Sequence, residues 1–521
     1  MRKFVSIVFL LFTVSFIGAA EGKEQLLTVI FTNDSHGMAW QFDEPNNPSI
    51  GGLAAQKTIV DTIRAEVQGK GGNVIILNAG DITLGDPRSN VCENMPFING
   101  MNLIGYDAMT IGNHEFDFGL EVFHKMKNAA KFPFLSANIY EEGGTKAVGR
   151  DYLEKKFDDG LKVAVLGLTT RETEVITGAG LMGNLVMTDP IIEAKTKVPF
   201  LRKNNDIVIV LSHLGFYETD KSFDGYYGDN YLPKVVPGID LIVGGHTQKH
   251  LSSPVKIGDT HIVQTEGLGK WVGRFDIYMK DKKIVKTDHK LYPVNLKEKK
   301  VKEDKVTYEL VGEPVVENKA MIDMLNGFKC TFPTKQIGKI ERDLIGDREL
   351  SRTQETELGN VITDVIREKT GADAAFMNSG SIRQGLEKGV ITEKDVYSVF
   401  PFMDTVFIAE LTGYQLQEVL DIFAEKGQGS PGFLQVSGIG LKLFKGSALE
   451  ITVNGKPLDK KRKYKVAFNS FIAGGGDGYT VLKNITAKKD TGYCIPSILV
   501  ENLKIKGTFA KPAEGRIKIV K

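Results

Sequence analysis

The 521-residue sequence contains little cysteine, only Cys92, Cys330 and Cys494. Three cysteines so far apart are too few for a disulfide framework, and no two lie close enough along the chain for a cysteine metal site. One pair could form a disulfide in an oxidising compartment, but the sequence does not say which pair. We therefore do not expect the function to depend on cysteine chemistry.

The sequence also lacks an excess of charge of either sign, because 66 basic residues against 65 acidic ones leave a net charge of +1. This balance gives no electrostatic reason to expect a nucleic acid or a membrane surface as partner. The apolar content of 42% and the charged content of 25% exclude the disordered and fibrous classes. The length predicts two or three domains.

The first twenty residues have the pattern of a secretory signal peptide. Arg2 and Lys3 precede the apolar run 5–17, and small residues follow up to a cleavage site after Ala20. The alternative is a membrane anchor, but the run is shorter than the ~20 residues that a membrane span needs. No cysteine follows the run, and the C-terminus lacks the hydrophobic tail of a glycolipid anchor. We expect an exported protein, periplasmic or extracellular, without a stable membrane anchor.

The first 300 residues alternate short apolar segments with helical patterns. Helices are expected after Gly52 and after Phe118. Short continuous apolar runs are typical of strands that are covered on both faces, so this half predicts a layered α/β domain. The expected strands are 26–34, 73–81, 108–115, 162–170, 206–215 and 240–247.

The character of the chain changes around residues 295–335. A charged run at 296–310 is expected to be solvated, and 317–329 is expected to form one amphipathic helix. This predicts a domain at 24–300, a linker with a helix at 301–335 and a second domain at 336–521. In the second domain a helix near 359–371 has an apolar face made of Leu358, Val361, Ile362, Val365 and Ile366.

Five of the six expected strands of the first domain end on aspartate, asparagine or histidine residues. Only the fourth strand, which ends at Thr169–Arg171, lacks such a residue. Ligand sites in open α/β sheets lie beyond the carboxyl ends of the strands, so these residues are expected to converge. All eight histidines precede residue 290, and four of them follow strands. The strand-end residues are Asp34, His36, Asp81, Asn113, His114, His213, His246 and Gln248.

Each of these residues alone has an ordinary explanation, such as a hydrogen-bonded structural histidine or, for Asp81, a turn. Together they form an Asp/His/Asn/Gln set without cysteine, which suits Mn, Zn, Fe or Co. There are more candidate ligands than one tetrahedral ion needs, and this points to two metals about 3.5–4 Å apart that share a carboxylate. Such a pair polarises a phosphoryl oxygen and lowers the pKa of a trapped water.

The motifs DSH, NAGD, GNHEFD, SHLG and GGHTQ, in this order, resemble the calcineurin-like metallophosphoesterase superfamily. The segments TVIFTNDSHG, GDITLGDPRSN, IGNHEFDFG and FPFLSANI resemble more narrowly the 5′-nucleotidase family of secreted or periplasmic two-domain enzymes. That family also includes UDP-sugar hydrolases and 2′,3′-cyclic phosphodiesterases. The resemblance implies a four-layer α/β/β/α metallophosphoesterase domain, a linker helix and a C-terminal α/β nucleotide-binding domain.

The resemblance also implies roles for the strand-end residues. One metal would be held by Asp34, His36, Asp81 and Gln248, and the other by Asp81, Asn113, His213 and His246. His114 would contact the phosphate and either stabilise the developing charge or protonate the leaving oxygen. Asp117 would orient His114, although it could instead be a helix N-cap.

In the second domain the resemblance implies a substrate site. Relatives sandwich the base between two aromatic rings, hold the ribose through an aspartate and bind phosphate through arginines, although each such residue alone could be core or surface. The sequence departs from the family pattern in two places, and in the first of them Ser379 and Ser381 replace family glycines. Asp404 stands where many relatives have a small or amide residue, which suggests a preference for guanine. The implied residues are Arg352, Asn378, Arg383, Phe402, Phe471 and Asp477.

The expected activity is two-metal hydrolysis of nucleoside 5′-monophosphates. The alternatives are a 2′,3′-cyclic nucleotide phosphodiesterase/3′-nucleotidase or a UDP-sugar hydrolase that uses the same site, and a non-catalytic secreted nucleotide-binding protein. A thiosulfate-type ester is disfavoured because it needs no base clamp such as Phe402 and Phe471. The sequence leaves metal identity, base preference and substrate class open, and a monomer is the expected state. Catalysis is expected to need domain closure across the linker.

Overall fold

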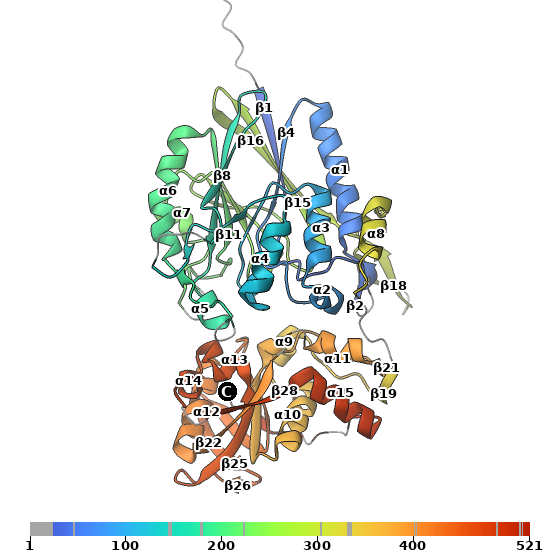
Figure 1. Ribbon diagram of the computed structural model, residues 1–521, viewed down its shortest axis with the longest axis vertical. Helices are drawn as coiled ribbons and strands as arrows, with labels where there is room; N and C mark the ends of the chain where they lie inside the picture. Colours follow the sequence, from blue (N-terminus) through green and yellow to red (C-terminus); the bar gives the residue numbers. More distant parts are fainter. Residues whose placement is uncertain are drawn as a thin grey trace, which may run out of the picture.

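The computed structural model describes residues 24–520 except 45–46, 144–147, 178–180, 222–224, 303–304, 331–335, 401, 403, 486–487, 510–511 and 513. The chain folds into an N-terminal body and a C-terminal body that meet along one face (Figure 1). The expected signal peptide lies outside the described residues. No helix in the described part combines the length and the apolar character that crossing a bilayer requires.

Two six-stranded sheets form the middle of the N-terminal body. In the first sheet β1, β4, β5 and β6 are parallel, and in the second β9, β11, β12 and β14 are parallel. The first has the order β16 (Lys283–Pro293), β15 (Trp271–Lys280), β1 (Glu24–Thr32), β4 (Asn73–Asn78), β5 (Ala108–Thr110), β6 (Phe134–Leu135). The second has the order β13 (Val255–Ile257), β14 (Thr260–Val263), β12 (Leu241–Gly244), β11 (Ile207–His213), β9 (Lys162–Thr169), β8 (Tyr152–Lys156).

Helices cover the outer face of each sheet, so the body has four layers. Helices α1 (Leu53–Gly69), α3 (Met95–Ile104) and α4 (Gly119–Ala129) pack on the first sheet, and α6 (Pro190–Asn204) packs on the second. Apolar side chains of β1 and β4 meet those of β9, β11 and β12 between the sheets. Every residue of β11 is buried, as expected for a strand covered on both faces. The predicted α/β/β/α fold is confirmed.

The segment expected as a linker packs largely on the N-terminal body. Its charged run forms the hairpin of β17 (Lys297–Lys302) and β18 (Lys305–Leu310). Helix α8 (Lys319–Asn326) buries Met321 and Leu325 against α1 and α3, because an apolar helix face is stable only when covered. A disulfide between Cys92 and Cys330 fastens the chain just beyond α8, and Cys494 is a free cysteine. The domain limits given above stay a prediction.

The C-terminal body has a five-stranded and a four-stranded sheet. Helices α10 (Glu357–Thr370), α11 (Glu393–Val399) and α15 (Ile495–Lys506) share one core, and the predicted apolar face of α10 is buried in it. Helix α12 (Gly413–Lys426) contributes to the other core. The sheets have the orders β23 (Leu434–Ser437), β20 (Ala374–Asn378), β27 (Lys463–Asn469), β22 (Thr405–Thr412), β28 (Lys489–Cys494) and β26 (Lys456–Pro457), β25 (Ser447–Val453), β24 (Ile439–Phe444), β29 (Ile517–Ile519).

Candidate functional site

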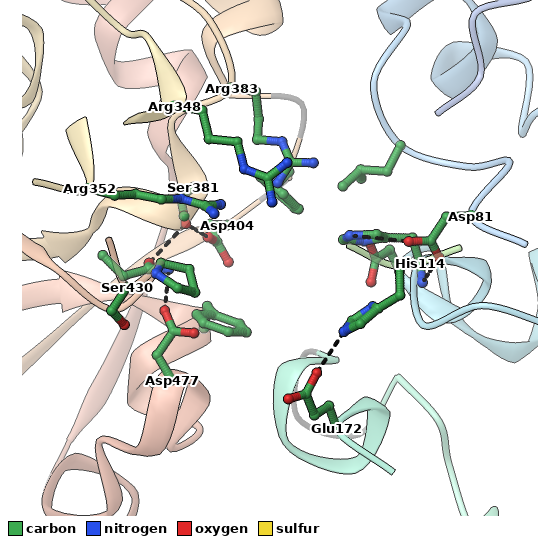
Figure 2. A pocket seen from close by; sticks show the side chains of 18 of the residues that line it. Asp81, His114, Glu172, Arg348, Arg352, Ser381, Arg383, Asp404, Ser430 and Asp477 are labelled. Atoms are coloured by element: carbon green, nitrogen blue, oxygen red, sulfur yellow. Dashed lines mark hydrogen bonds and ion pairs between the residues drawn. The ribbon is translucent and has the colours of Figure 1, made fainter. Parts of the chain in front are cut away.

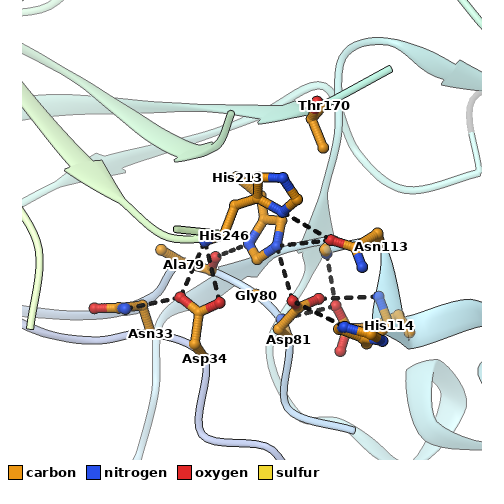
Figure 3. Close-up of polar contacts among 12 residues, drawn as sticks. Asn33, Asp34, Ala79, Gly80, Asp81, Asn113, His114, Thr170, His213 and His246 are labelled. Atoms are coloured by element: carbon orange, nitrogen blue, oxygen red, sulfur yellow. Dashed lines mark hydrogen bonds and ion pairs between the residues drawn. The ribbon is translucent and has the colours of Figure 1, made fainter. Parts of the chain in front are cut away.

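The strand ends of both N-terminal sheets bring their polar residues into one cluster (Figure 3). Two groups of possible metal-ligand atoms occur among the described residues, each with all its atoms within 4.8 Å of one another. Asp81, which follows β4, belongs to both groups and so lies where a shared carboxylate is needed. The groups are Asp34, His36 and Asp81, and Asp81, His213 and His246.

Five of the clustered residues have a left-handed backbone. This conformation is costly for residues other than glycine, roughly 1–3 kcal/mol each, and it persists only where the surrounding structure enforces it. All five lie within four residues of the end of β1, β4 or β12. The φ angles are 47° at Asp34, 46° at His36, 54° at Asp81, 71° at His246 and 54° at Gln248.

The three clustered histidines are oriented as metal ligands usually are. His36 Nδ1 donates to the carbonyl of Thr83 at 3.0 Å, and His213 Nδ1 donates to the carbonyl of Ala79 at 2.6 Å. A carbonyl oxygen can only accept, so Nδ1 carries a hydrogen and the other nitrogen of each ring is the one that can offer its lone pair to a cation. His246 is reversed: its Nδ1 lies 3.0 Å from Asn113 Oδ1, which places this nitrogen at the cluster.

Burial and the charges of neighbouring groups shift the pKa values of this cluster away from their ordinary values. Burial raises the pKa of Asp34 to about 6, helped by the charge of Asp81. Burial lowers the pKa of His213, but the charge and hydrogen bond of Asp81 outweigh it and raise the pKa to about 10. His213 Nε2 lies 3.1 Å from Asp81 Oδ2, a position where a cation can replace the proton. The residues therefore fit a pair of divalent ions.

The loop around Asp81 is fixed by Glu115. Its carboxylate accepts from the backbone N–H groups of Gly112 at 2.6 Å, Asp81 at 3.0 Å and Ile82 at 2.8 Å. Gly112 has to be glycine, because a Cβ there would lie 2.2 Å from Asp81 Oδ1. The GNHE segment thus supplies one cluster residue, Asn113, and also the support for Asp81.

His114 stands beside the cluster with its ring held by Asp117. His114 Nδ1 lies 2.5 Å from Asp117 Oδ2, and its Nε2 lies 4.0 Å from Asp81 Oδ2. Burial lowers the pKa of His114, but Asp117 and Asp81 raise it overall. The alternative of Asp117 as a helix N-cap does not match the structure, because α4 has Phe118 at its N-cap and no side-chain capping bond.

The cluster opens into a cleft of about 1260 Å³ that both bodies line (Figure 2). On the opposite wall Arg348 Nη1 lies 3.3 Å from Gln248 Oε1. The amide nitrogen Nε2 of Gln248 lies 2.8 Å from His36 Nε2. The ring of Phe402 lies 6.0 Å from that of His114, measured between centroids. The structure therefore has the two bodies closed on one another.

Three arginines of the C-terminal body face the cluster across this cleft (Figure 2). Burial, together with the charges of Arg348 and Arg383, holds the pKa of Arg352 well below its usual range. Burial likewise lowers the pKa of Arg383 to about 10. Arg352 Nε is buried without a hydrogen-bond partner in the described structure. Converging guanidinium groups with unmet donors fit a bound anion.

The remaining C-terminal residues line the same cleft. Asn378 Nδ2 donates to Asp477 Oδ2 at 2.8 Å, so the two expected substrate residues form one unit. Phe402 and Phe471 both border the cleft. The structure thus brings all six expected substrate residues to the cleft that the metal-ligand cluster opens into.

Asp404 is engaged within the protein. Its Oδ1 accepts from Ser470 Oγ at 2.7 Å, and its Oδ2 accepts from Asn469 Nδ2 at 3.0 Å and Ser381 Oγ at 3.4 Å. A carboxylate with three internal donors has little capacity left to read a base. The geometry favours a structural role, and the predicted guanine preference stays a prediction.

Two residues of this cleft were not expected from the sequence. Arg348 is the first residue of α9 (Arg348–Ser351) and lies four residues before Arg352. The sequence indicates it only as a second arginine in the segment RELSR. Glu172 lies 2.6 Å from His246 Nε2 through its Oε2. It follows β9, the one strand whose end carried no recognisable polar motif.

Comparison with known proteins assigns both parts of the chain. Residues 27–250 match the family described as calcineurin-like phosphoesterase, and residues 336–484 match the 5′-nucleotidase C-terminal domain. The chain is 35% identical over 505 residues to the protein UshA of Escherichia coli (strain K12), covering 92% of this chain and 91% of that protein.

Two further relatives that are named 5′-nucleotidases match nearly the whole chain. A 5′-nucleotidase of Vibrio cholerae is 35% identical over 509 residues, covering 92% of this chain and 91% of that protein. The structure is similar to that of a 5′-nucleotidase precursor from Thermus thermophilus, with a TM-score of 0.79 and 28% identity over 95% of this chain and 99% of that one. The calcineurin-like fold implies divalent metals, and the two ligand groups described above are its candidates. The chain therefore belongs to the 5′-nucleotidase family of metal-dependent phosphoester hydrolases.

Proposed function

We propose that this protein is a 5′-nucleotidase, which releases phosphate from nucleoside 5′-monophosphates. The observation that carries this proposal is one cleft in which a cation-binding cluster faces three arginines and two phenylalanines. A phosphate ester between the two walls would meet cations on one side and guanidinium groups on the other. The base would lie between the aromatic rings, because every base has a π-face.

The proposed ligands are Asp34, His36, Asp81 and Gln248 for one ion and Asp81, Asn113, His213 and His246 for the other. Two divalent cations bound there would supply Lewis acidity and an activated water for in-line attack on phosphorus. The set favours Mn, Zn, Co or Fe, and the loading depends on availability. The described chain shows these side chains in contact, through the Asp81–His213, His246–Asn113 and His36–Gln248 pairs.

The chain's own residues act on the charge that develops at phosphorus. His114, oriented through its Nδ1 by Asp117, presents its Nε2 toward the cluster and donates to a phosphoryl or leaving oxygen. Arg348, Arg352 and Arg383 neutralise the phosphate oxygens. Asn378 and Asp477 bind the nucleoside, with Phe402 and Phe471 on either side of its base. No protein nucleophile is required.

The same site suits other nucleotide esters. Cyclic 2′,3′-nucleotides and nucleotide sugars also combine a base with a phosphoryl group, and the cleft of about 1260 Å³ is larger than a monophosphate requires. These substrates are the second candidates. A non-catalytic nucleotide-binding protein is disfavoured, because His114 and all the proposed ligands are present.

The test is phosphate release by the purified protein from AMP, GMP, CMP, UMP, UDP-glucose and 2′,3′-cyclic AMP. Each substrate is measured after treatment with chelator and again with added Mn²⁺, Zn²⁺ or Co²⁺. Monophosphates are expected to react fastest, with no release in chelator. Faster hydrolysis of the cyclic or sugar substrate would assign the site to those alternatives, and release that is insensitive to chelator would contradict the metal mechanism.

We also propose export, with cleavage after Ala20, which rests on the pattern of residues 1–20. Mass spectrometry of the mature protein from the periplasm or medium tests it. A mature chain that keeps residues 1–20 would contradict it.

A further inference from the structure

The turn that follows β9 contacts the half of the cluster proposed for the second metal. Thr170 N donates to the His213 carbonyl at 3.1 Å, and Thr177 Oγ1 donates to the Asn113 carbonyl at 3.4 Å. Between them, Glu172 reaches the imidazole of His246 (Figure 2). One turn therefore contacts three of the four residues proposed to hold that ion.

The His246 ring has only one nitrogen that can face a cation in the cluster. Its Nδ1 lies 3.0 Å from Asn113 Oδ1, and its Nε2 lies 2.6 Å from Glu172 Oε2. An ionised carboxylate only accepts hydrogen bonds, so Nε2 carries the hydrogen and Nδ1 is left with its lone pair. The Glu172 carboxylate thus selects the tautomer that can bind a metal.

The backbone holds Glu172 firmly in this place. Its N–H donates to Thr170 Oγ1 at 3.2 Å, and Thr173 Oγ1 donates to the Thr170 carbonyl at 2.6 Å. Glu172 is only 7% exposed although it borders the cleft. A buried carboxylate is stable only with a partner, and the imidazole supplies one.

We propose that Glu172 is a positioning residue for the second metal, which acts by fixing the ring and tautomer of His246. A carboxylate on the outer nitrogen of a metal-binding histidine also raises its basicity, and losing such a partner costs about 10–100-fold in metal affinity. The inference rests on the proposed two-metal site. It assigns a function to the fourth strand end, where the sequence showed no motif.

The test is Co²⁺ binding by the full-length metal-free protein, followed by the visible absorption of Co²⁺ and by competition with a chelator. Glu172→Ala is expected to bind one ion with wild-type affinity and the other about 10–100-fold more weakly. Glu172→Gln keeps the shape and an acceptor but loses the charge, so a smaller loss is expected. Glu174→Gln is the matched control, since Glu174 is on the same turn but pairs with Arg171 at the surface.

The unfolding temperature of each metal-free variant separates positioning from general stability, and Glu172→Gln decides if Glu172→Ala does not fold. The role of Glu172 would be overturned if each site bound Co²⁺ with the same affinity in Glu172→Gln and Glu172→Ala as in the wild type. An equal loss of affinity at both sites would overturn it as well. Wild-type protein that binds fewer than two Co²⁺ ions would contradict the proposed two-metal site instead.

Discussion

At the scale of single residues, His114 differs from the proposed ligands because it lies beside the cluster and belongs to neither group of possible metal ligands. Its contacts are Asp117 on one nitrogen and, at 4.0 Å, Asp81 on the other. Its neighbour Asn113 lies 3.0 Å from His246 Nδ1 and belongs to the cluster itself. Two adjacent residues therefore have different proposed roles, metal binding for Asn113 and catalysis for His114.

We expect His114→Ala to lower kcat by about 100- to 10,000-fold, the usual contribution of a general acid, while two metal ions stay bound. Phosphate release from AMP and metal content by atomic absorption measure both effects. His124→Ala, an exposed histidine on α4, is the control and should change neither. An unchanged kcat in His114→Ala would contradict the assigned role.

A second residue-scale prediction concerns Asp477, which is 6% exposed at the cleft. If it holds the ribose hydroxyls, Asp477→Ala should lower kcat/KM for AMP by about 10- to 100-fold, as expected for about 1.5–3 kcal/mol of charged hydrogen bonding. Hydrolysis of 2′,3′-dideoxy-AMP should be lowered much less, because that substrate has no hydroxyls to lose. Equal losses for both substrates would assign Asp477 a structural role.

The residues predictable from the sequence were those that follow a strand in a recognisable motif. Asp34, Asp81 and His213 are of this kind, because the end of a buried strand fixes where the next side chain lies. Glu172 was not predictable, because it reaches His246 through a turn after β9, and nothing in the local pattern reports that turn. Arg348 was not predictable either, since its contact with Gln248 depends on how the two bodies dock.

At the scale of elements, one charged contact ties α1 to β15. Arg274 of β15 is 8% exposed, and its Nη1 lies 2.9 Å from Glu66 of α1. Hydrogen bonds from Arg274 and Lys70 lower the pKa of Glu66 from 4.5 to about 2. A lowered folded-state pKa means that the contact stabilises fully above pH 4.5 and is lost as the pH falls toward 2.

We expect Glu66→Gln to lower the free energy of unfolding at pH 7 by about 1 kcal/mol or less, because water screens a half-exposed carboxylate. The difference from wild type should shrink as the pH falls below 4.5. Urea unfolding at several pH values measures it, with Glu121→Gln as an exposed control. A difference that grows toward acid pH would contradict the assigned pKa direction.

The elements themselves were largely predictable. Strands covered on both faces have a continuous apolar sequence, and this pattern differs from the alternation of apolar and polar residues in amphipathic helices. Six expected strands and the helices α1, α4 and α10 occur where the patterns placed them. The strands end earlier than expected, as at Thr110 in β5, because the polar residues lie in the loops beyond them. The hairpin of β17 and β18 was missed, since its charged sequence has the composition of a solvated segment.

At the scale of the whole molecule, the metal-ligand cluster belongs to the N-terminal body, whereas the cleft in front of it is lined by both bodies. Contacts across the interface include α2 (Pro87–Val91) with α11 and α5 (Thr173–Ile176) with the turn Gly476–Gly478. We expect substrate entry and product release from a cleft lined by both bodies to involve their separation.

A disulfide engineered between α2 and α11 should therefore slow turnover strongly when oxidised, and reductant should restore it. Each single-cysteine variant, treated in the same way, controls for reduction of the Cys92–Cys330 bond. Steady-state phosphate release is the measurement. Undiminished turnover with the bodies locked together would show that they need not separate.

The proposed hydrolysis depends on two cations bound in one cluster, and a metal titration measures this dependence. Phosphate release from AMP is followed while Mn²⁺ is added to chelator-stripped protein. Activity should rise from zero and saturate at about two equivalents, and Asp81→Asn should stay inactive because it replaces the shared carboxylate by a neutral amide. Full activity at one equivalent, or in the stripped protein, would contradict a two-metal mechanism.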